Sequence, residues 1–250
     1  MPPTELHAIP GFADPFSSLS HLIGAAVFAA LTVPLLRRRV REVGCGRGGV
    51  AALGVFAGAT ILQLSLSGVY HMLGRGGQAR DVMQRLDHAA IFVLIAATFT
   101  PVHAILFRGL RQWGMIAMVW VLAALGVTLK SVYFLQMPAA IGMALYLGMG
   151  WVGAFSMRAI WRRYDLRLAM PLVLGGVAYT IGAVIEWVHV MGPIVGVFGA
   201  HEMFHVAALT GLALHWRMMW VIATMKGPEP PSKQTEPRGP VTPIIAAIET

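Results

Sequence analysis

Seven long apolar stretches, separated by short polar segments, decide what this chain can fold into. They lie at residues 18–36, 50–73, 87–107, 112–130, 137–157, 169–191 and 199–223. Crossing about 30 Å of hydrocarbon takes roughly 20 helical residues, and these stretches are that long or nearly so. Their apolar runs are continuous rather than alternating, which argues against transmembrane strands. The sequence therefore predicts an all-α integral membrane protein, folded as a bundle of seven transmembrane helices.

The composition agrees with a chain that has little soluble material. Hydrophobic residues make up 57% and charged residues 12% of the sequence, whereas a soluble domain is about 25% charged. We expect a membrane domain at 18–223, an N-terminal segment at 1–17 and a flexible, Pro-rich tail at 224–250. The first sixteen residues contain no Lys or Arg. They therefore lack the basic region of a signal peptide, and the first helix should direct its own insertion.

The formal charge of +8 reflects basic residues in the short segments between apolar stretches. That distribution is typical of membrane orientation, so we expect no nucleic-acid partner. With seven spans, fifteen basic residues fall on the side away from the N-terminus. The N-terminal side holds four, namely Arg75, Arg80, Arg85 and Lys130. The positive-inside rule then predicts an N-terminus outside and a C-terminus in the cytoplasm.

Five polar residues should meet at the N-terminal side of the membrane. Ser67 and His71 are four apart at the end of the second stretch, and His201 and His205 are four apart at the start of the seventh. Such pairs share one helical face. Asp87 opens the third stretch. Ionisable groups inside a membrane are functional candidates by default.

Three neutral imidazoles with an open fourth position form the ligand set of a catalytic zinc site. We therefore predict that His71, His201 and His205 bind zinc. Asp87 would accept the proton of a zinc-bound water or orient that water, and Ser67 would hydrogen-bond the water or a substrate oxygen. The expected substrate is a membrane lipid with an electrophilic amide or ester carbonyl.

Other interpretations of this polar cluster remain open. In the first alternative there is no metal, and the histidines form hydrogen bonds between helices or line a water-filled cavity. Zinc would be structural in a receptor or a lipid sensor. Histidines from two helices would bind axially in a b-type haem protein. Transport is disfavoured because polar residues are sparse in the middle of the apolar stretches.

The remaining histidines have weaker claims to the site. His215 lies ten residues beyond His205, about 15 Å along a helix, which is too far for the same ion. His88 follows Asp87 but points elsewhere, so it should pack or bond to the backbone. His103 lies near the opposite end of the third stretch, and His21 is a candidate to support the metal ligands.

Two acidic residues lie close to the predicted site in the sequence. Glu186 and His189 are three apart, and we expect them to pair with each other or to line an entrance to the site. For Glu202, which neighbours His201, we expect a salt bridge with an Arg in a loop.

Several motifs together resemble one family. They are Ser67-Gly-Val-Tyr-His71, Arg85-Leu-Asp-His-Ala-Ala-Ile-Phe, Thr98-Phe-Thr-Pro101 and His201-Glu-Met-Phe-His205, followed by His215. Over about residues 14–220 the chain is similar to the hemolysin III branch of the progestin and adipoQ receptor family. The resemblance implies a seven-helix bundle in a bacterial inner or plasma membrane, with zinc held by His71, His201 and His205. It also implies a relation to alkaline ceramidases and other proposed metal-dependent lipid hydrolases, in which Ser67 and Asp87 would surround a metal-bound water.

The chain departs from this family in two respects. In Asp14-Pro-Phe-Ser17-Ser-Leu-Ser20-His21, Ser17 stands where Asn is usual and Ser20 where Thr is usual. The receptor branch also has its N-terminus inside, whereas the charge count predicts an N-terminus outside. Nothing in the sequence indicates pore formation, so we treat the haemolytic activity in the family name as a label only.

Overall fold

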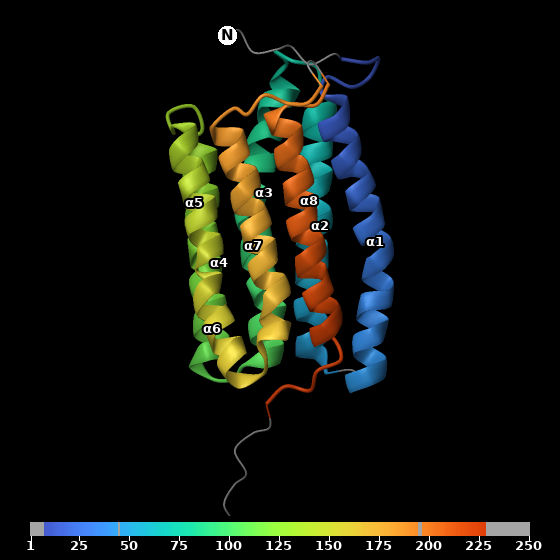
Figure 1. Ribbon diagram of the computed structural model, residues 1–250, viewed down its shortest axis with the longest axis vertical. Coiled ribbons are helices and arrows are strands. Elements are labelled where there is room, and N and C mark those ends of the chain that lie inside the picture. The colour runs from blue at the N-terminus through green and yellow to red at the C-terminus, as the bar shows by residue number, and fades with distance from the viewer. Residues whose placement is uncertain (1–7, 45, 195–196, 229–250) are drawn as a thin grey trace, which may run out of the picture.

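The computed structural model describes residues 8–44, 46–194 and 197–228. Within these residues, eight helices run roughly parallel to the long axis of the molecule (Figure 1). They are α1 (Pro15–Val43), α2 (Arg47–Met72), α3 (Gln78–Leu106), α4 (Leu110–Val132), α5 (Ala139–Trp151), α6 (Gly153–Arg163), α7 (Leu166–Trp187) and α8 (Ala200–Ile222). Only Val152 separates α5 from α6. Most of the predicted flexible tail lies outside the described residues.

The described chain is an all-α membrane protein. Six helical segments are long and apolar enough to cross a membrane, with α5 and α6 together forming one of them. The remaining helix, α8, has 23 residues. Three histidines, Glu202 and Arg217 lower the apolar character of its sequence. It nevertheless packs along α7 and α1 inside the bundle.

Several helices extend beyond the predicted apolar stretches. α3 begins at Gln78, well before the predicted start at residue 87. Residues 78–85 contain no Gly or Pro, and Asp81 in the first turn interacts favourably with the helix dipole. The stretch predicted at 137–157 is two helices that continue to Arg163. Charged residues lowered the apolar character there without ending the helix.

α3 is the central helix of the bundle. The apolar core between α1, α2 and α8 includes Trp216, whose ring lies 4.9 Å from Phe28 and 5.5 Å from Phe56. In the most apolar part of α3, 78% of the residues are buried, against 22% in the corresponding parts of α1, α4 and α7. Side chains carried by α3 therefore face several other helices at once.

With α5 and α6 counted as one, successive helices run in opposite directions along the bundle. The last turns of α2 and α7 and the first turns of α1, α3 and α8 therefore lie at the same end (Figure 1). We call this the histidine end, because it contains His71, His201 and His205. α1 and α2 approach closely there: a Cβ on Gly68 would lie only 2.6 Å from Cγ of Leu22. The Ser18 hydroxyl donates to the Gly68 carbonyl at 2.7 Å. This contact places the start of α1 directly beside the predicted site.

Candidate metal centre

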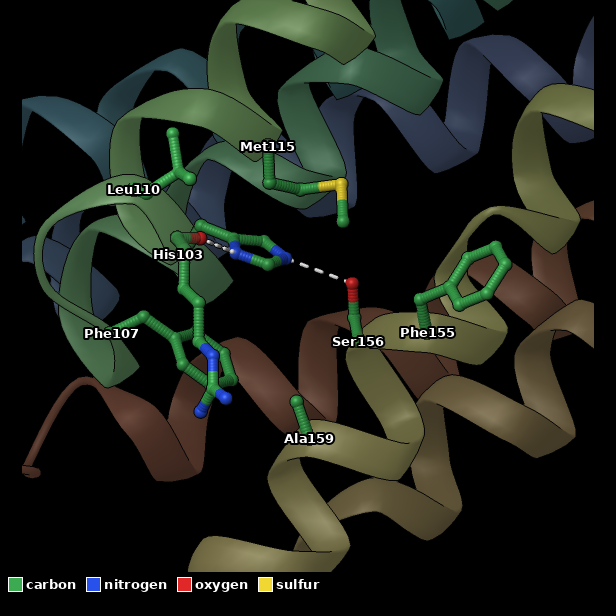
Figure 2. Close-up of a pocket in the computed structure, with 8 residues that line it drawn as sticks. His103, Phe107, Leu110, Met115, Phe155, Ser156 and Ala159 are labelled. Atoms are coloured by element: carbon green, nitrogen blue, oxygen red, sulfur yellow. Dashed lines mark hydrogen bonds between the residues drawn. The ribbon is translucent and has the colours of Figure 1, made fainter.

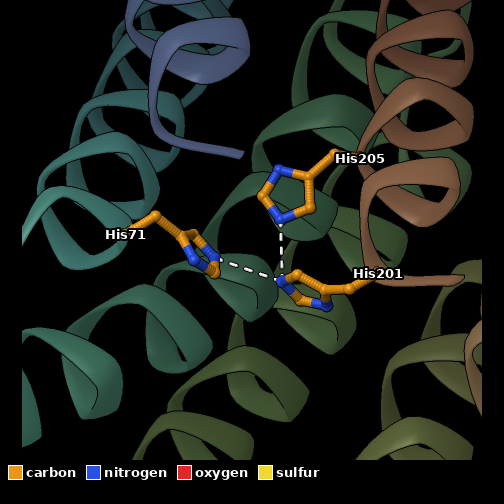
Figure 3. Close-up of side chains that lie close together, drawn as sticks. All are labelled: His71, His201 and His205. Atoms are coloured by element: carbon orange, nitrogen blue, oxygen red, sulfur yellow. Dashed lines mark hydrogen bonds between the residues drawn. The ribbon is translucent and has the colours of Figure 1, made fainter. Parts of the chain in front are cut away.

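Three histidine side chains converge at the histidine end (Figure 3). His71 comes from the last turn of α2, and His201 and His205 come from the first two turns of α8. Nε2 of His201 lies 3.3 Å from Nε2 of His71 and 3.1 Å from Nε2 of His205. One ligand atom from each residue lies within 4.8 Å of the other two. The three residues predicted to meet therefore do so.

Two carboxylates fix the hydrogen positions on these rings. Nδ1 of His71 lies 3.1 Å from Oδ2 of Asp14, and Nδ1 of His201 lies 3.2 Å from Oε1 of Glu186. A carboxylate only accepts hydrogen bonds, so each Nδ1 carries a hydrogen. In a neutral imidazole, Nε2 then presents a lone pair. The lone pairs of His71 and His201 face each other at 3.3 Å.

This donor set fits a metal ion better than it fits hydrogen bonds among the rings. A single proton can bridge one pair of Nε2 atoms, whereas a cation can satisfy all three. Zinc–nitrogen bonds of about 2.0–2.1 Å in a tetrahedral site hold neighbouring nitrogens about 3.3 Å apart. Two of the three Nε2 separations, 3.3 and 3.1 Å, are close to that value, and the third pair of ligand atoms lies within 4.8 Å. Carboxylates behind ligating histidines are also a recurrent feature of metal sites.

His205 lacks a supporting carboxylate. It is buried, and its Nδ1 has no hydrogen-bond partner among the described residues. The ring of His21 packs against it, with centroids 4.0 Å apart and planes tilted by 35°. Neither ring nitrogen of His21 has a partner in the described part of the chain. Among the described residues, His21 therefore supports His205 through ring contact alone.

Asp14 links the start of α1 to the ends of two other helices. Besides His71, its carboxylate accepts hydrogen bonds from Arg75 at 2.8 Å and Arg80 at 2.6 Å. Arg80 also donates to the Leu73 carbonyl. Burial opposes ionisation of Asp14, but the hydrogen bonds from His71, Arg80 and Arg75 outweigh it and hold its pKa well below the usual value. An ionised Asp14 therefore fixes the His71 ring and ties α1, α2 and α3 together.

Asp87 lies beside the histidines, together with Gln63 and Ser67 of α2. Nε2 of Gln63 donates to its Oδ1 at 3.0 Å, and the Ser67 side chain lies beside the carboxylate. Gln63, Ser67 and His71 recur at four-residue intervals on α2, so they form one polar stripe that faces α3. Asp87 and Ser67 are both buried. The two predicted catalytic residues therefore contact each other on the same α2 face that carries His71.

Comparison with known proteins agrees with this architecture. Residues 12–216 match the family model described as "Haemolysin-III related". The chain belongs to the haemolysin-III-related family. Hemolysin-3 of Bacillus cereus is 32% identical over 99 residues, which cover 40% of this chain and 45% of that protein. The Hemolysin-3 homolog of Bacillus subtilis (strain 168) is 28% identical over 127 residues, covering 51% and 59%. The chain thus spans about half the length of the curated relatives it matches.

In this haemolysin-III-related protein, two acidic residues have partners that were not expected. Glu202 was predicted to form a salt bridge with an Arg, but it accepts a hydrogen bond from the Ser17 hydroxyl at 3.1 Å. Its other oxygen accepts from the backbone N–H of Gly199 at 2.9 Å, at the start of α8. Glu186 was expected to pair with His189 or to line an entrance to the site, and its carboxylate lies next to His201. Both acids therefore help to hold the start of α8 in place.

The other histidines of this family member lie where expected. Nδ1 of His88 lies 2.7 Å from the Gln84 carbonyl, which is the predicted bond to the backbone. His215 lies outside the metal-ligand group, with Nε2 3.3 Å from the Leu172 carbonyl. His103 lies near the end of α3, far from the histidine end. His7 lies outside the described residues.

Sequence reasoning missed Gln63 and the contacts that two carboxylates make with His71 and His201. Gln63 could have been found, because it continues the four-residue spacing of Ser67 and His71. The contact of Asp14 with His71 joins residues 57 positions apart, and that of Glu186 with His201 joins α7 to α8. No spacing rule within one helix connects either pair.

Proposed function

We propose that this protein is a zinc-dependent membrane hydrolase that cleaves an amide or ester bond of a lipid. The observation that carries the proposal is the convergence of three Nε2 atoms, two of them on rings whose Nδ1 atoms face carboxylates. His71, His201 and His205 would hold the ion. We further propose that α8 is the seventh span and that the N-terminus lies outside, as the charge count predicts.

When bound, zinc lowers the pKa of a coordinated water from about 15.7 towards 7 and polarises a carbonyl oxygen. Asp87 would accept a proton during attack on the lipid carbonyl and return it to the leaving amine or alcohol. The hydrogen bond from Gln63 holds the Asp87 carboxylate in place, and Ser67 lies beside it. The burial of Asp87 and Ser67 limits competing water. Lipid would reach these groups from the membrane around the bundle.

The decisive experiment is elemental analysis of the protein purified without chelator. We expect about one zinc per chain in the unmodified protein. A His71→Ala/His201→Ala double variant should contain none, and a His215→Ala variant should retain its zinc because His215 lies outside the group. A zinc-loaded protein would then be screened against lipid amides and esters. A metal-free protein of normal fold would exclude both the metal centre and the hydrolase.

A second candidate function is a membrane receptor or lipid sensor with a structural zinc. It is favoured by the way Asp14 joins the start of α1 to His71 on α2 and to Arg80 on α3. An ion between α2 and α8 would extend that connection to a fourth helix. Turnover separates the two functions, because a structural site would keep its zinc and show no hydrolysis that depends on Asp87.

A further inference from the structure

A second polar group lies near the end of the bundle opposite the metal centre. It consists of His103 on α3 and Ser156 on α6, which form a hydrogen bond beside a cavity of about 230 Å³ (Figure 2). Both side chains are buried, with 3% of His103 and 1% of Ser156 exposed. None of the residues assigned to the metal centre lines this cavity.

The hydrogen bonds of His103 fix which atom donates. Nδ1 of His103 lies 2.7 Å from the backbone carbonyl of Arg111, and a carbonyl oxygen only accepts. Nδ1 therefore carries the hydrogen, and Nε2 of the neutral ring has a lone pair. Nε2 lies 2.8 Å from Oγ of Ser156, so the Ser156 hydroxyl donates to it. A serine hydroxyl that donates to an oriented imidazole is the arrangement of an activated nucleophile.

The imidazole is also held rigidly by two aromatic neighbours. The rings of Phe99 and Phe107, one helical turn away on either side, stack on it at centroid distances of 6.2 and 4.9 Å. Their planes differ from that of His103 by 19° and 23°. With both nitrogens hydrogen-bonded, the ring has no freedom to turn away from Ser156.

The cavity suits an acyl chain with a carbonyl group. Its walls are mainly apolar, and two residues that line it, Leu110 and Phe155, are 87% and 71% exposed. An acyl group in the bilayer therefore has access to it. Arg111 also lines the cavity, and a positive charge there favours negative charge that develops on a carbonyl oxygen.

We propose that Ser156 is the nucleophile of a second, metal-independent site that accepts acyl esters. Oγ of Ser156 attacks the ester carbonyl carbon while its proton passes to Nε2 of His103. The ester C–O bond breaks, and the alcohol leaves with that proton. Water then attacks the acyl-serine, again giving a proton to His103, and releases the fatty acid as the proton returns to Ser156. Arg111 stabilises the oxyanion in both steps.

Labelling with a long-chain alkyl fluorophosphonate tests this proposal directly on the purified, folded protein. The reagent transfers its phosphonyl group to an activated serine and releases fluoride. We expect one adduct per chain at neutral pH, located on Ser156 by peptide mass spectrometry, and none in a Ser156→Ala variant. His103→Phe keeps an aromatic ring between Phe99 and Phe107 but removes the base. It should label about 100-fold more slowly.

A His71→Ala variant is the matched control, because it changes a histidine of the metal centre. It should label at the unmodified rate, as should protein stripped of metal. Absence of an adduct on Ser156 in the folded protein would overturn the proposal, and so would equal labelling of the His103→Phe variant. Since the readout is a covalent adduct, it is independent of zinc content and of lipid hydrolysis at the other end.

Discussion

Histidines occur at both ends of this bundle, but their ring nitrogens are satisfied in different ways. At the opposite end, Nδ1 of His103 faces a carbonyl acceptor and Nε2 faces a hydroxyl donor, so one neutral ring satisfies both. At the histidine end, carboxylates face Nδ1 of His71 and His201, and the Nε2 atoms face each other. The first arrangement needs no ion. The second can hold one, so the partners of the nitrogens, rather than the number of histidines, distinguish the two ends.

Removing one converging nitrogen should have the largest effect. We expect His205→Ala to lose its zinc and, with it, the stabilisation that binding gives the folded state. That stabilisation is about 2.7 kcal/mol when free zinc is 100 times the dissociation constant. Metal analysis and thermal unfolding with and without added zinc would measure both. A variant that retained one zinc per chain would show that His205 is not a ligand.

Asp87→Asn should separate catalysis from metal binding. The amide keeps the shape of the side chain but cannot accept a proton, so hydrolysis of the lipid should fall by about 10²–10⁴-fold. Zinc content should stay near that of the unmodified protein. Hydrolysis and zinc would be measured on the same preparation. Loss of zinc together with activity would make Asp87 a ligand instead of a base.

Asp14→Asn should weaken the metal centre without abolishing it. The amide is a poorer acceptor for Nδ1 of His71, and it loses the ionic contacts with Arg75 and Arg80. Removing a carboxylate behind a ligating histidine typically lowers metal affinity by about 10–100-fold. Competition with a zinc chelator measures this. The matched control is Asp81→Asn, an exposed acid in the first turn of α3, whose affinity should not change.

Glu186→Gln should have a smaller effect of the same kind. Glu186 is 35% exposed and His201 39% exposed at their side chains, so water can replace part of the lost hydrogen bond. We expect zinc affinity to fall by no more than about tenfold, near the lower limit for such partners. The same chelator competition would show whether Glu186→Gln loses less zinc affinity than Asp14→Asn. A larger loss than in Asp14→Asn would reverse the relative importance assigned to the two carboxylates.

His103→Ala should leave zinc content unchanged, which is the smallest of the expected effects. It tests whether the two ends of the bundle are independent. Its nitrogens already have a donor and an acceptor, so no ion depends on it. Thermal unfolding should still report a loss of stability from the missing bond to Ser156. A fall in zinc content would mean that the two ends are coupled through α3.

The membrane class and the three converging histidines followed from the sequence. Long apolar stretches must form helices in a bilayer because every backbone polar group there needs a partner. Successive spans cross the membrane in opposite directions, so the end of the second span and the start of the seventh lie on the same side. This placed His71, His201 and His205 at one end. Residues four apart share a face, which also placed Ser67 beside His71. The helix boundaries were less certain, as the early start of α3 at Gln78 illustrates, because charged residues near the membrane surface do not end a helix.

The tertiary structure decided which groups surround the histidines. The bond from Asp14 to His71, that from Glu186 to His201 and the ring contact between His21 and His205 all join different helices. The same holds for His103 and Ser156. Helical periodicity determines which side chains share a face of one helix, so it predicts contacts only within that helix. The rotation and depth at which two helices meet depend on packing, and Leu22 packs directly against Gly68 in this way. That packing sets the environment of each ring nitrogen.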